Sequence, residues 1–184
     1  MNSDFIKFYG AASYLLHRKS AGFTYLNLDC EMTKTCIKFI LLFAVIFAID
    51  QAIKILFLNG FSWQGEFFSL ELTLNRGVAF SMFAFLGENL KFIQIALISA
   101  LAAYVFCHKK LFCEHWMPFA LMLAGGCSNL LDRFIRGGVV DYVAWHKWFE
   151  FAVFNFADVM IDLAVVIFIF QGLRTAKKEK NEEK

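Results

Sequence analysis

The feature that most constrains this chain is a set of four long apolar stretches, which cover residues 37–58, 92–107, 116–131 and 154–173. A helix needs about 20 mostly apolar residues to cross the hydrocarbon core of a bilayer. The second and third stretches are shorter, but their long polar flanking side chains can extend to the interface. Apolar residues make up 59% of the chain and charged residues only 18%, so too few polar side chains remain to solvate four such helices in water. We therefore predict a mainly α-helical integral membrane protein with four transmembrane helices.

Basic residues are unevenly divided between the two sides that four spans would create. One side holds twelve of them: Lys7, Arg18, Lys19, Lys34, Lys38, Lys109, Lys110, Arg174, Lys177, Lys178, Lys180 and Lys184. The other side holds five: Arg76, Lys91, Arg133, Arg136 and Lys147. Cytoplasmic loops carry an excess of Lys and Arg. This distribution predicts cytoplasmic termini, with loops 59–90 and 132–153 outside.

The ends of the chain differ in composition from its centre. Residues 1–36 mix polar, basic and aromatic residues, and Met32-Thr33-Lys34 resembles a natural start. We interpret 1–36 as an N-terminal extension or as the result of a start codon placed too early. Residues 37–173 form the predicted membrane domain, and 174–184 form a charged cytoplasmic tail that we expect to be disordered.

The first outer loop carries a strand pattern. Residues 67–74 partly alternate apolar and polar side chains and lead into Asn75-Arg76-Gly77, a turn signal. We expect a small extracytoplasmic β-sheet with an interfacial loop or helix. In the last loop, Trp145 and Trp148 have two interpretations, a belt at the membrane interface or a contact with substrate.

Motifs for cofactors, metals and nucleic acid are absent from the sequence. It has no Walker loop and no GxGxxG, and its net charge is only +2. Its five cysteines form no CxxC and have no His at zinc-like spacing: Cys30, Cys36, Cys107, Cys113 and Cys127. We expect free thiols, no cofactor, no metal and no nucleic-acid partner.

Polar residues inside the apolar stretches gather on single helix faces, mainly at the outer ends. The third stretch carries Gly125, Asn129, Asp132 and Arg133 on one face, and the fourth carries Asn155, Asp158 and Asp162. Ionisable groups at membrane depth are costly and need a reason. One such reason is structural, because polar groups can join neighbouring helices by hydrogen bonds. The small residues Gly125, Gly126 and Ser128 would let the backbones of those helices approach closely.

Structural pairing explains some of these acids and leaves two others. Asp50 has Lys54 at i+4, and Asp132 has Arg133 beside it. Asp141 and Asp158 have no cation at helical spacing. Two carboxyls close together in an apolar site share a proton, so one serves as a base on water and the other as an acid on a carbonyl oxygen. Periodicity alone does not decide between catalysis and structural pairing.

Five motifs in order, between residues 37 and 172, resemble those of bacterial lipoprotein signal peptidase, the type II signal peptidase. They are Asp50-Gln51-x-x-Lys54, Asn75-Arg76-Gly77-Val78-Ala79-Phe80, Gly125-Gly126 with Asn129-x-x-Asp132-Arg133, Gly138-Val139-Val140-Asp141, and Phe154-Asn155-x-Ala157-Asp158. The resemblance implies an aspartyl endopeptidase whose catalytic pair is Asp141 and Asp158. It also implies supporting or substrate-binding residues: Asp50, Asn75, Gly77, Asn129, Asp132, Arg133, Asn155 and Ala157. We take Asp132 as supporting, although a catalytic role for it stays open.

The resemblance also implies a substrate, a prolipoprotein whose cysteine carries a diacylglyceryl group and before which the enzyme cuts. The partners implied are membrane lipids and, upstream, a prolipoprotein diacylglyceryl transferase, with the enzyme acting as a monomer. The implied location is the bacterial cytoplasmic (inner) membrane, with the active site at the outer leaflet.

Two features depart from the family pattern. Residues 125–128 read Gly-Gly-Cys-Ser, where the family often has Gly-Ala-Leu-Gly. Asp162 is not expected from the family and lies about 6 Å deeper than Asp158. One hypothesis is that Asp162 raises the pKa of Asp158 or holds a water. The alternative, which we favour, is a bond to a neighbouring helix.

Two other functions remain open from the residues alone. A small transporter or proton channel would use Asp50, Asp158 and Asp162 as a relay, but it would need acids spread through the membrane depth. A non-catalytic assembly factor would use the same polar groups only to join helices.

Overall fold

The computed structural model describes residues 3–77, 84–87, 89–149 and 151–182. Val78, Ala79 and Phe80 of the second family motif lie outside the described residues. The chain divides into two compact units, residues 1–37 and 38–184, and each is described by itself. The boundary between the N-terminal extension and the membrane domain stays a prediction.

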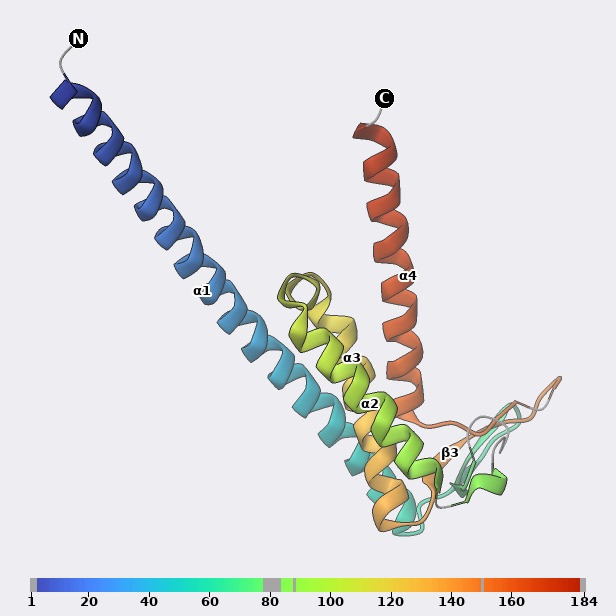
Figure 1. The fold of residues 1–184 in the computed structure, drawn as a ribbon. Helices are drawn as coiled ribbons and strands as arrows, with labels where there is room; N and C mark the ends of the chain where they lie inside the picture. The colour runs from blue at the N-terminus through green and yellow to red at the C-terminus, as the bar shows by residue number, and fades with distance from the viewer. Residues whose placement is uncertain (1–2, 78–83, 88, 150, 183–184) are drawn as a thin grey trace. The chain divides into compact units, whose positions relative to one another are not determined.

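Helices dominate the described chain (Figure 1). In order, the elements are α1 (Ser3–Leu58), β1 (Trp63–Gln64), β2 (Phe68–Asn75), η2 (Ala84–Leu86), α2 (Asn89–Cys107), α3 (Lys109–Ile135), β3 (Val139–Trp145) and α4 (Phe156–Glu182). Each of the four predicted apolar stretches falls within one α-helix, apart from Phe154 and Asn155, which lie just before α4. This confirms the prediction of a mainly α-helical protein.

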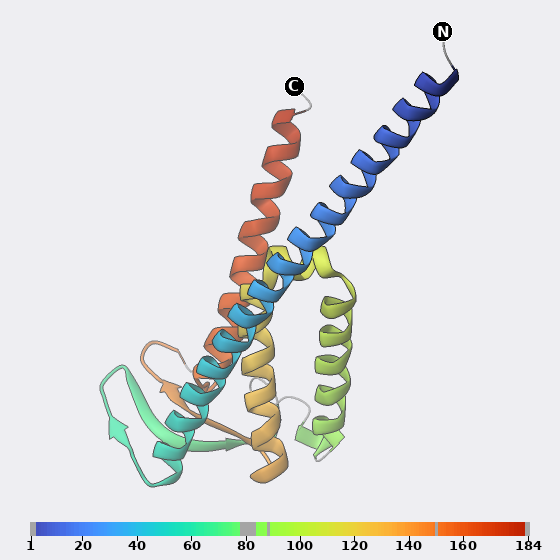
Figure 2. The same cartoon turned by 90° about the vertical axis from the view of Figure 1, so that its left-hand side faces the viewer.

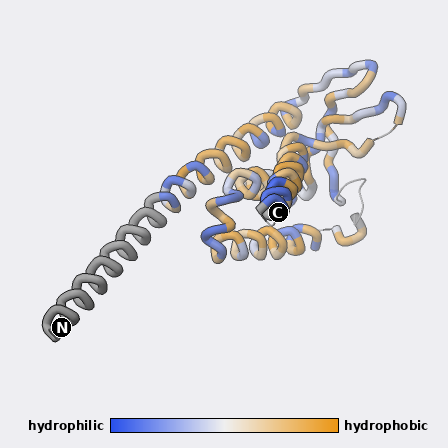
Figure 3. The backbone as a smooth tube through the Cα atoms, turned by 90° about the horizontal axis from the view of Figure 1, so that it is seen from above, coloured by the Kyte–Doolittle hydropathy of each residue, from blue (hydrophilic) through white to orange (hydrophobic). Residues whose placement is uncertain are grey.

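Three helical segments are long and apolar enough to cross a membrane: Glu31–Leu58, Asn89–Cys107 and Phe156–Lys178. Figure 3 shows hydrophobic residues dominating these helices and hydrophilic ones at the C-terminal end of α4. The remaining helix, α3, is not among these three segments. Its buried face carries the polar residues of the third stretch. The protein is therefore a multi-pass membrane protein.

Two local features of the helices were not predicted. We expected residues 174–184 to be disordered, but α4 continues to Glu182; Ala, Lys and Glu are strong helix formers and extend a helix that already exists. The backbone of α3 leaves helical geometry at His115, three residues before Pro118, whose ring disrupts the preceding turn. Within the described residues, Cys36, Cys107, Cys113 and Cys127 take part in no disulfide.

The small sheet has three antiparallel strands in the order β1-β2-β3. Strand β2 confirms the predicted strand. Strand β3 was not predicted, since its first four residues are all buried and the sequence therefore shows no alternation. The register places Asn75 opposite Val139 and Thr73 opposite Asp141. Neighbouring side chains on one face of a sheet can interact diagonally, so the sheet brings Asn75 close to Asp141.

Within residues 38–184, the helix ends meet at the sheet. Figures 1 and 2 show the ends of α1 and α3 and the beginning of α4 beside the strands. Gly125 allows α3 to pack tightly on α4, because a Cβ there would lie 2.7 Å from the carbonyl oxygen of Ala157 and 2.9 Å from Cγ1 of Ile161. The predicted close approach at Gly125 is confirmed, and it brings the polar face of α3 against the start of α4.

Candidate active site

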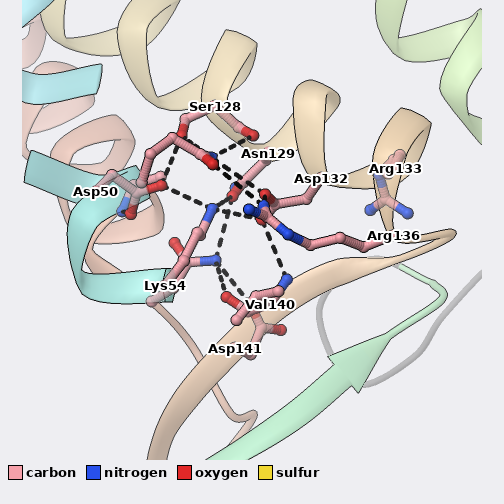
Figure 4. A network of polar contacts seen from close by, with 12 residues as sticks. Asp50, Lys54, Ser128, Asn129, Asp132, Arg133, Arg136, Val140 and Asp141 are labelled. Carbon is pink, nitrogen blue, oxygen red and sulfur yellow. Dashed lines mark hydrogen bonds and ion pairs between the residues drawn. The ribbon is translucent and has the colours of Figure 1, made fainter. Parts of the chain in front are cut away.

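A buried cation lies at the centre of the polar residues (Figure 4). The Lys54 Nζ atom is 2.7 Å from Asp50 Oδ2, 2.7 Å from Asp132 Oδ2 and 2.7 Å from Asn129 Oδ1. The side chains of Lys54, Asp50 and Asp132 are fully buried. The predicted pair of Asp50 and Lys54 is confirmed, and the same ammonium also holds α3.

Asp50 joins α1 to the start of α4. Its Oδ1 accepts a 2.8 Å hydrogen bond from the backbone N–H of Ala157, in the first turn of α4. Its Oδ2 accepts a 2.6 Å bond from the Ser128 hydroxyl. A carboxylate is favourable at a helix N-terminus because the first backbone N–H groups have no partner within the helix. Asp50 therefore fixes where α4 begins.

Asp132 has a different partner from the one predicted. It pairs with Lys54 and with Arg136, the residue that follows the end of α3, and not with the adjacent Arg133. Adjacent side chains on a helix point in different directions, whereas residues four apart share a face. Asp132 also accepts a bond from the backbone N–H of Val140 at 3.2 Å, so it anchors the start of β3.

Arg133 reaches across to α2 and to the end of β2. Its Nε donates to Gln94 Oε1 at 2.9 Å, and its Nη2 donates to the Gly77 carbonyl at 2.5 Å. Gln94 in turn donates to the Gly126 carbonyl at 3.1 Å. The Gly77 N–H donates to Asn75 Oδ1 at 2.9 Å. Arg133 thus holds the turn that positions Asn75.

Asp141 and Asp158 come together through asparagines. Asp141 accepts bonds from Asn155 Nδ2 on Oδ1 at 2.7 Å and from Asn75 Nδ2 on Oδ2 at 2.9 Å. Asp158 accepts bonds from Asn129 Nδ2 on Oδ1 at 2.8 Å and from the backbone N–H of Asn155 on Oδ2 at 3.1 Å. Each carboxyl oxygen of the pair is held by an amide group. Neither acid has a salt bridge to a residue in the described part of the chain.

The backbone around Asp141 is fixed by pairing with the segment before α4. The N–H groups of Tyr142 and Val143 donate to the Phe154 carbonyl at 3.1 and 2.9 Å. The Phe156 N–H donates to the Tyr142 hydroxyl at 2.9 Å. This pairing sets Asp141 beside Asn155 and Asp158, although sixteen residues lie between Asp141 and Asp158 in the sequence.

Burial changes the acidity of Asp141. It raises the pKa of Asp141 to about 6 and is the largest influence on that group. The hydrogen bonds from Asn75 and Asn155 and the charge of Lys54 act in the opposite direction, while the charge of Asp158 raises the pKa further. Asp141 therefore keeps its proton to a higher pH than an ordinary Asp.

The pair lines a cavity of about 440 Å³, a volume typical of ligand-binding clefts. Residues from α2, α3, β3 and α4 line it, including Asn129, Arg133, Asp141 and Asp158. Lys54 and Asp132 are not among the lining residues. The cavity can therefore admit a ligand to the two acids without exposing the buried ion pairs.

Asp162 lies on the same cavity. We favoured a bond between Asp162 and a neighbouring helix, and this interpretation is wrong: the residue is exposed, and it has no hydrogen bond or ion pair within the described residues. The two interpretations of the tryptophans remain open; Trp148 is 77% exposed and Trp145 donates to the Lys147 carbonyl.

Sequence reasoning missed four polar contributors. Gln51 donates to Ser128 Oγ and Asp132 Oδ1, Arg136 pairs with Asp132, and Gln94 orients Arg133. Ser128 was noted only as a small residue. In the sequence, each of these residues could have been found as a polar side chain inside or at the end of an apolar stretch, where such a side chain needs a partner. In the described part of the chain, no cluster of three His, Cys, Asp or Glu side chains could hold a metal ion.

Comparison with known proteins decides the family. The profile of signal peptidase (SPase) II matches residues 42–174. This chain belongs to the signal peptidase II family. It is similar to the lipoprotein signal peptidase from Wolinella succinogenes, with 55% identity over 130 residues that cover 71% of this chain and 89% of the relative. It is also similar to the lipoprotein signal peptidase from Campylobacter jejuni, with 50% identity over 142 residues that cover 77% of this chain and 90% of the relative. The Helicobacter pylori enzyme is 46% identical over 146 residues, which cover 79% of this chain and 93% of the relative.

A solved structure has the same fold. It is a bacterial membrane enzyme determined by the in meso method at 2.3 Å resolution. The TM-score is 0.65 at 25% identity, and the match covers 77% of this chain and 90% of that one. The predicted family and fold class are confirmed. This signal peptidase II is an aspartyl peptidase of the membrane that removes signal peptides from prolipoproteins, cutting before the lipidated cysteine.

Proposed function

We propose that Asp141 and Asp158 are the catalytic pair that cleaves the prolipoprotein. One observation carries this assignment: these two acids line the cavity together, and amide groups rather than cations hold both carboxyls. Amide donors orient a carboxyl without fixing its charge, so the pair can hold one proton between them. Asp50 and Asp132, in contrast, are committed to buried ion pairs.

The pair activates water directly. The ionised carboxyl takes a proton from a water molecule while the water oxygen bonds to the scissile carbonyl carbon, and the protonated carboxyl gives its proton to the carbonyl oxygen. In the tetrahedral intermediate, the first carboxyl returns its proton to the leaving amine as the C–N bond breaks. The second carboxyl recovers its proton from a hydroxyl of the intermediate, and the pair returns to its starting state.

The remaining site residues hold this arrangement. Asn75, Asn129 and Asn155 orient the two carboxyls, and Gly77 and Arg133 hold the turn that carries Asn75. Asp50 with Ala157 fixes the start of α4, and Asp132 fixes the start of β3. Removing one partner of a buried ion pair leaves an uncompensated charge, so loss of Asp50 or Asp132 lowers activity by displacing the pair.

The proposed substrate is the diacylglyceryl form of a prolipoprotein, processed at the outer leaflet of the bacterial cytoplasmic (inner) membrane with both termini of the enzyme in the cytoplasm. The excess of basic residues on one side supports this orientation, and the site lies at the opposite ends of the helices. Because the cut precedes a lipidated cysteine, the diacylglyceryl transferase reaction comes first. We also propose that the enzyme acts as a monomer, as the family resemblance implies.

The test replaces each acid by its amide. Asp141→Asn and Asp158→Asn should each lower cleavage of a lipidated precursor by at least about a thousandfold, and the uncut lipidated precursor should accumulate in cells. Glu71→Gln, at an exposed acid of β2 away from the cavity, is the matched control and should cleave normally. If either site variant matures lipoproteins at the normal rate, the assignment fails, and an assembly role would fit better.

A further inference from the structure

Asp162 is an acid that the proposed chemistry does not use. It lies on α4 one turn beyond Asp158, about 6 Å further from the sheet, and lines the same cavity. Six other cavity-lining side chains able to hydrogen bond have partners: Asn75, Gln94, Asn129, Arg133, Asp141 and Asp158. Within the described residues, Asp162 has none.

The cavity that Asp162 lines has an apolar part as well as a polar one. Its apolar lining includes Ile93 and Leu97 of α2 and Ile161 of α4. Asp162 also lies in the apolar segment Phe156–Lys178, where an acid without a partner is costly. A ligand that enters the cavity is therefore a source of a hydrogen-bond donor for this carboxyl.

A peptide in the cavity would bring such donors. An extended chain exposes a backbone N–H at each residue, and in an apolar site these groups need acceptors. Such a chain rises about 3.3 Å per residue. The 6 Å between Asp158 and Asp162 therefore corresponds to about two residues of substrate. In the proposed orientation the deeper side holds the signal peptide, which precedes the scissile bond.

We propose that Asp162 is a substrate-binding residue that accepts a backbone N–H from the signal peptide, about two residues before the scissile bond. This rests on the proposed function, because it takes Asp141 and Asp158 as the point of cleavage. Asp162 holds the peptide in register and takes no part in proton transfer, and the bonds from Asn129 and Asn155 orient Asp158 without it.

The test separates binding from chemistry. Asp162→Ala should raise KM for a lipidated precursor peptide about tenfold, as expected for loss of a hydrogen bond to a charged group, while kcat stays within about twofold. Asp162→Asn keeps an acceptor oxygen and should restore most of the binding. Leu163→Ala, at the exposed apolar neighbour on the same turn, should resemble the wild type. The Kd of the same peptide, measured with each variant in an Asp141→Asn background, should be highest for Asp162→Ala and closest to the wild-type value for Leu163→Ala, with Asp162→Asn between them.

Two results would overturn the inference. One is unchanged KM and Kd in Asp162→Ala. The other is an equal loss of kcat in Asp162→Ala and Asp162→Asn with a shifted pH optimum, which would mean that the charge of Asp162 acts on the groups facing the cavity, Arg133, Asp141 and Asp158. Failure of the proposed function is distinguishable, because Asp141→Asn would then still cleave.

Discussion

At the scale of single residues, the acids of the site fall into two groups that differ in their hydrogen-bond and ion-pair partners. Asp50 and Asp132 share the ammonium of Lys54 and are fully buried. Asp141 and Asp158 meet amide donors and face the cavity. Sequence spacing predicted the bond between Asp50 and Lys54 because both lie on one helix. It could not predict that Lys54 also binds Asp132, because that contact joins residues far apart in the chain.

The same reasoning gives a pH prediction for Asn75. Its bond to Asp141 Oδ2 stabilises the carboxylate and so lowers the pKa of Asp141. In Asn75→Ala this influence is lost, the pKa of Asp141 rises, and the pair should keep its shared proton to higher pH. The alkaline limb of kcat/KM should therefore move upward in pH, along with a loss of rate because Asp141 is less well oriented.

A pH–rate profile of purified wild type and Asn75→Ala measures this shift. Because two coupled acids titrate together, the limbs belong to the pair and not to one residue. A limb that moves to lower pH, or does not move, would contradict the assigned role of Asn75.

At the scale of elements, the contact between α3 and α4 sets the geometry of the site. Gly125 leaves room for the Ala157 carbonyl and the Ile161 side chain, so Asn129 of α3 can reach Asp158 of α4. The spacing of small residues predicted this close approach. The strand β3 and the partner of Asp132 were not predictable in the same way, because they depend on contacts between the chain after α3 and other elements.

Enlarging Gly125 should therefore disturb both stability and activity. In Gly125→Val the added atoms clash with the backbone of α4, and overpacking of this kind costs about 1–3 kcal/mol. Thermal unfolding in detergent should occur several degrees lower than in the wild type, and kcat should fall. Gly172→Val is the matched control, since a Cβ at Gly172 of α4 would meet nothing within 4 Å. Equal unfolding temperatures for Gly125→Val and wild type would refute the close contact.

At the scale of the whole molecule, the apolar stretches predicted where the helices lie, and the family motifs predicted which polar residues meet. Helix ends were less predictable, as the continuation of α4 to Glu182 shows, because propensity extends a helix beyond its apolar part. Asp162 was singled out by its depth, but its surroundings could not be read from the spacing. The cavity that it lines also takes residues from α2, which lies far from Asp162 in the sequence.

The proposed orientation can be tested on the intact protein. A reporter that is active only in the cytoplasm, fused after Lys184, should be active, because the basic residues at the C-terminal end favour that side. The same reporter inserted in the 59–67 loop should be inactive. An active loop fusion would reverse the orientation and place the site at the inner leaflet.

The central claim is that Asp141 and Asp158 act as one unit on a shared proton. The most direct measurement is single-turnover cleavage of a lipidated precursor by purified Asp141→Asn, Asp158→Asn and the double variant. Residues that act as a unit lose function together, so the double variant should be no slower than the slower single variant. A double variant whose loss equals the product of two partial losses, or a single variant that cleaves at the wild-type rate, would contradict the claim.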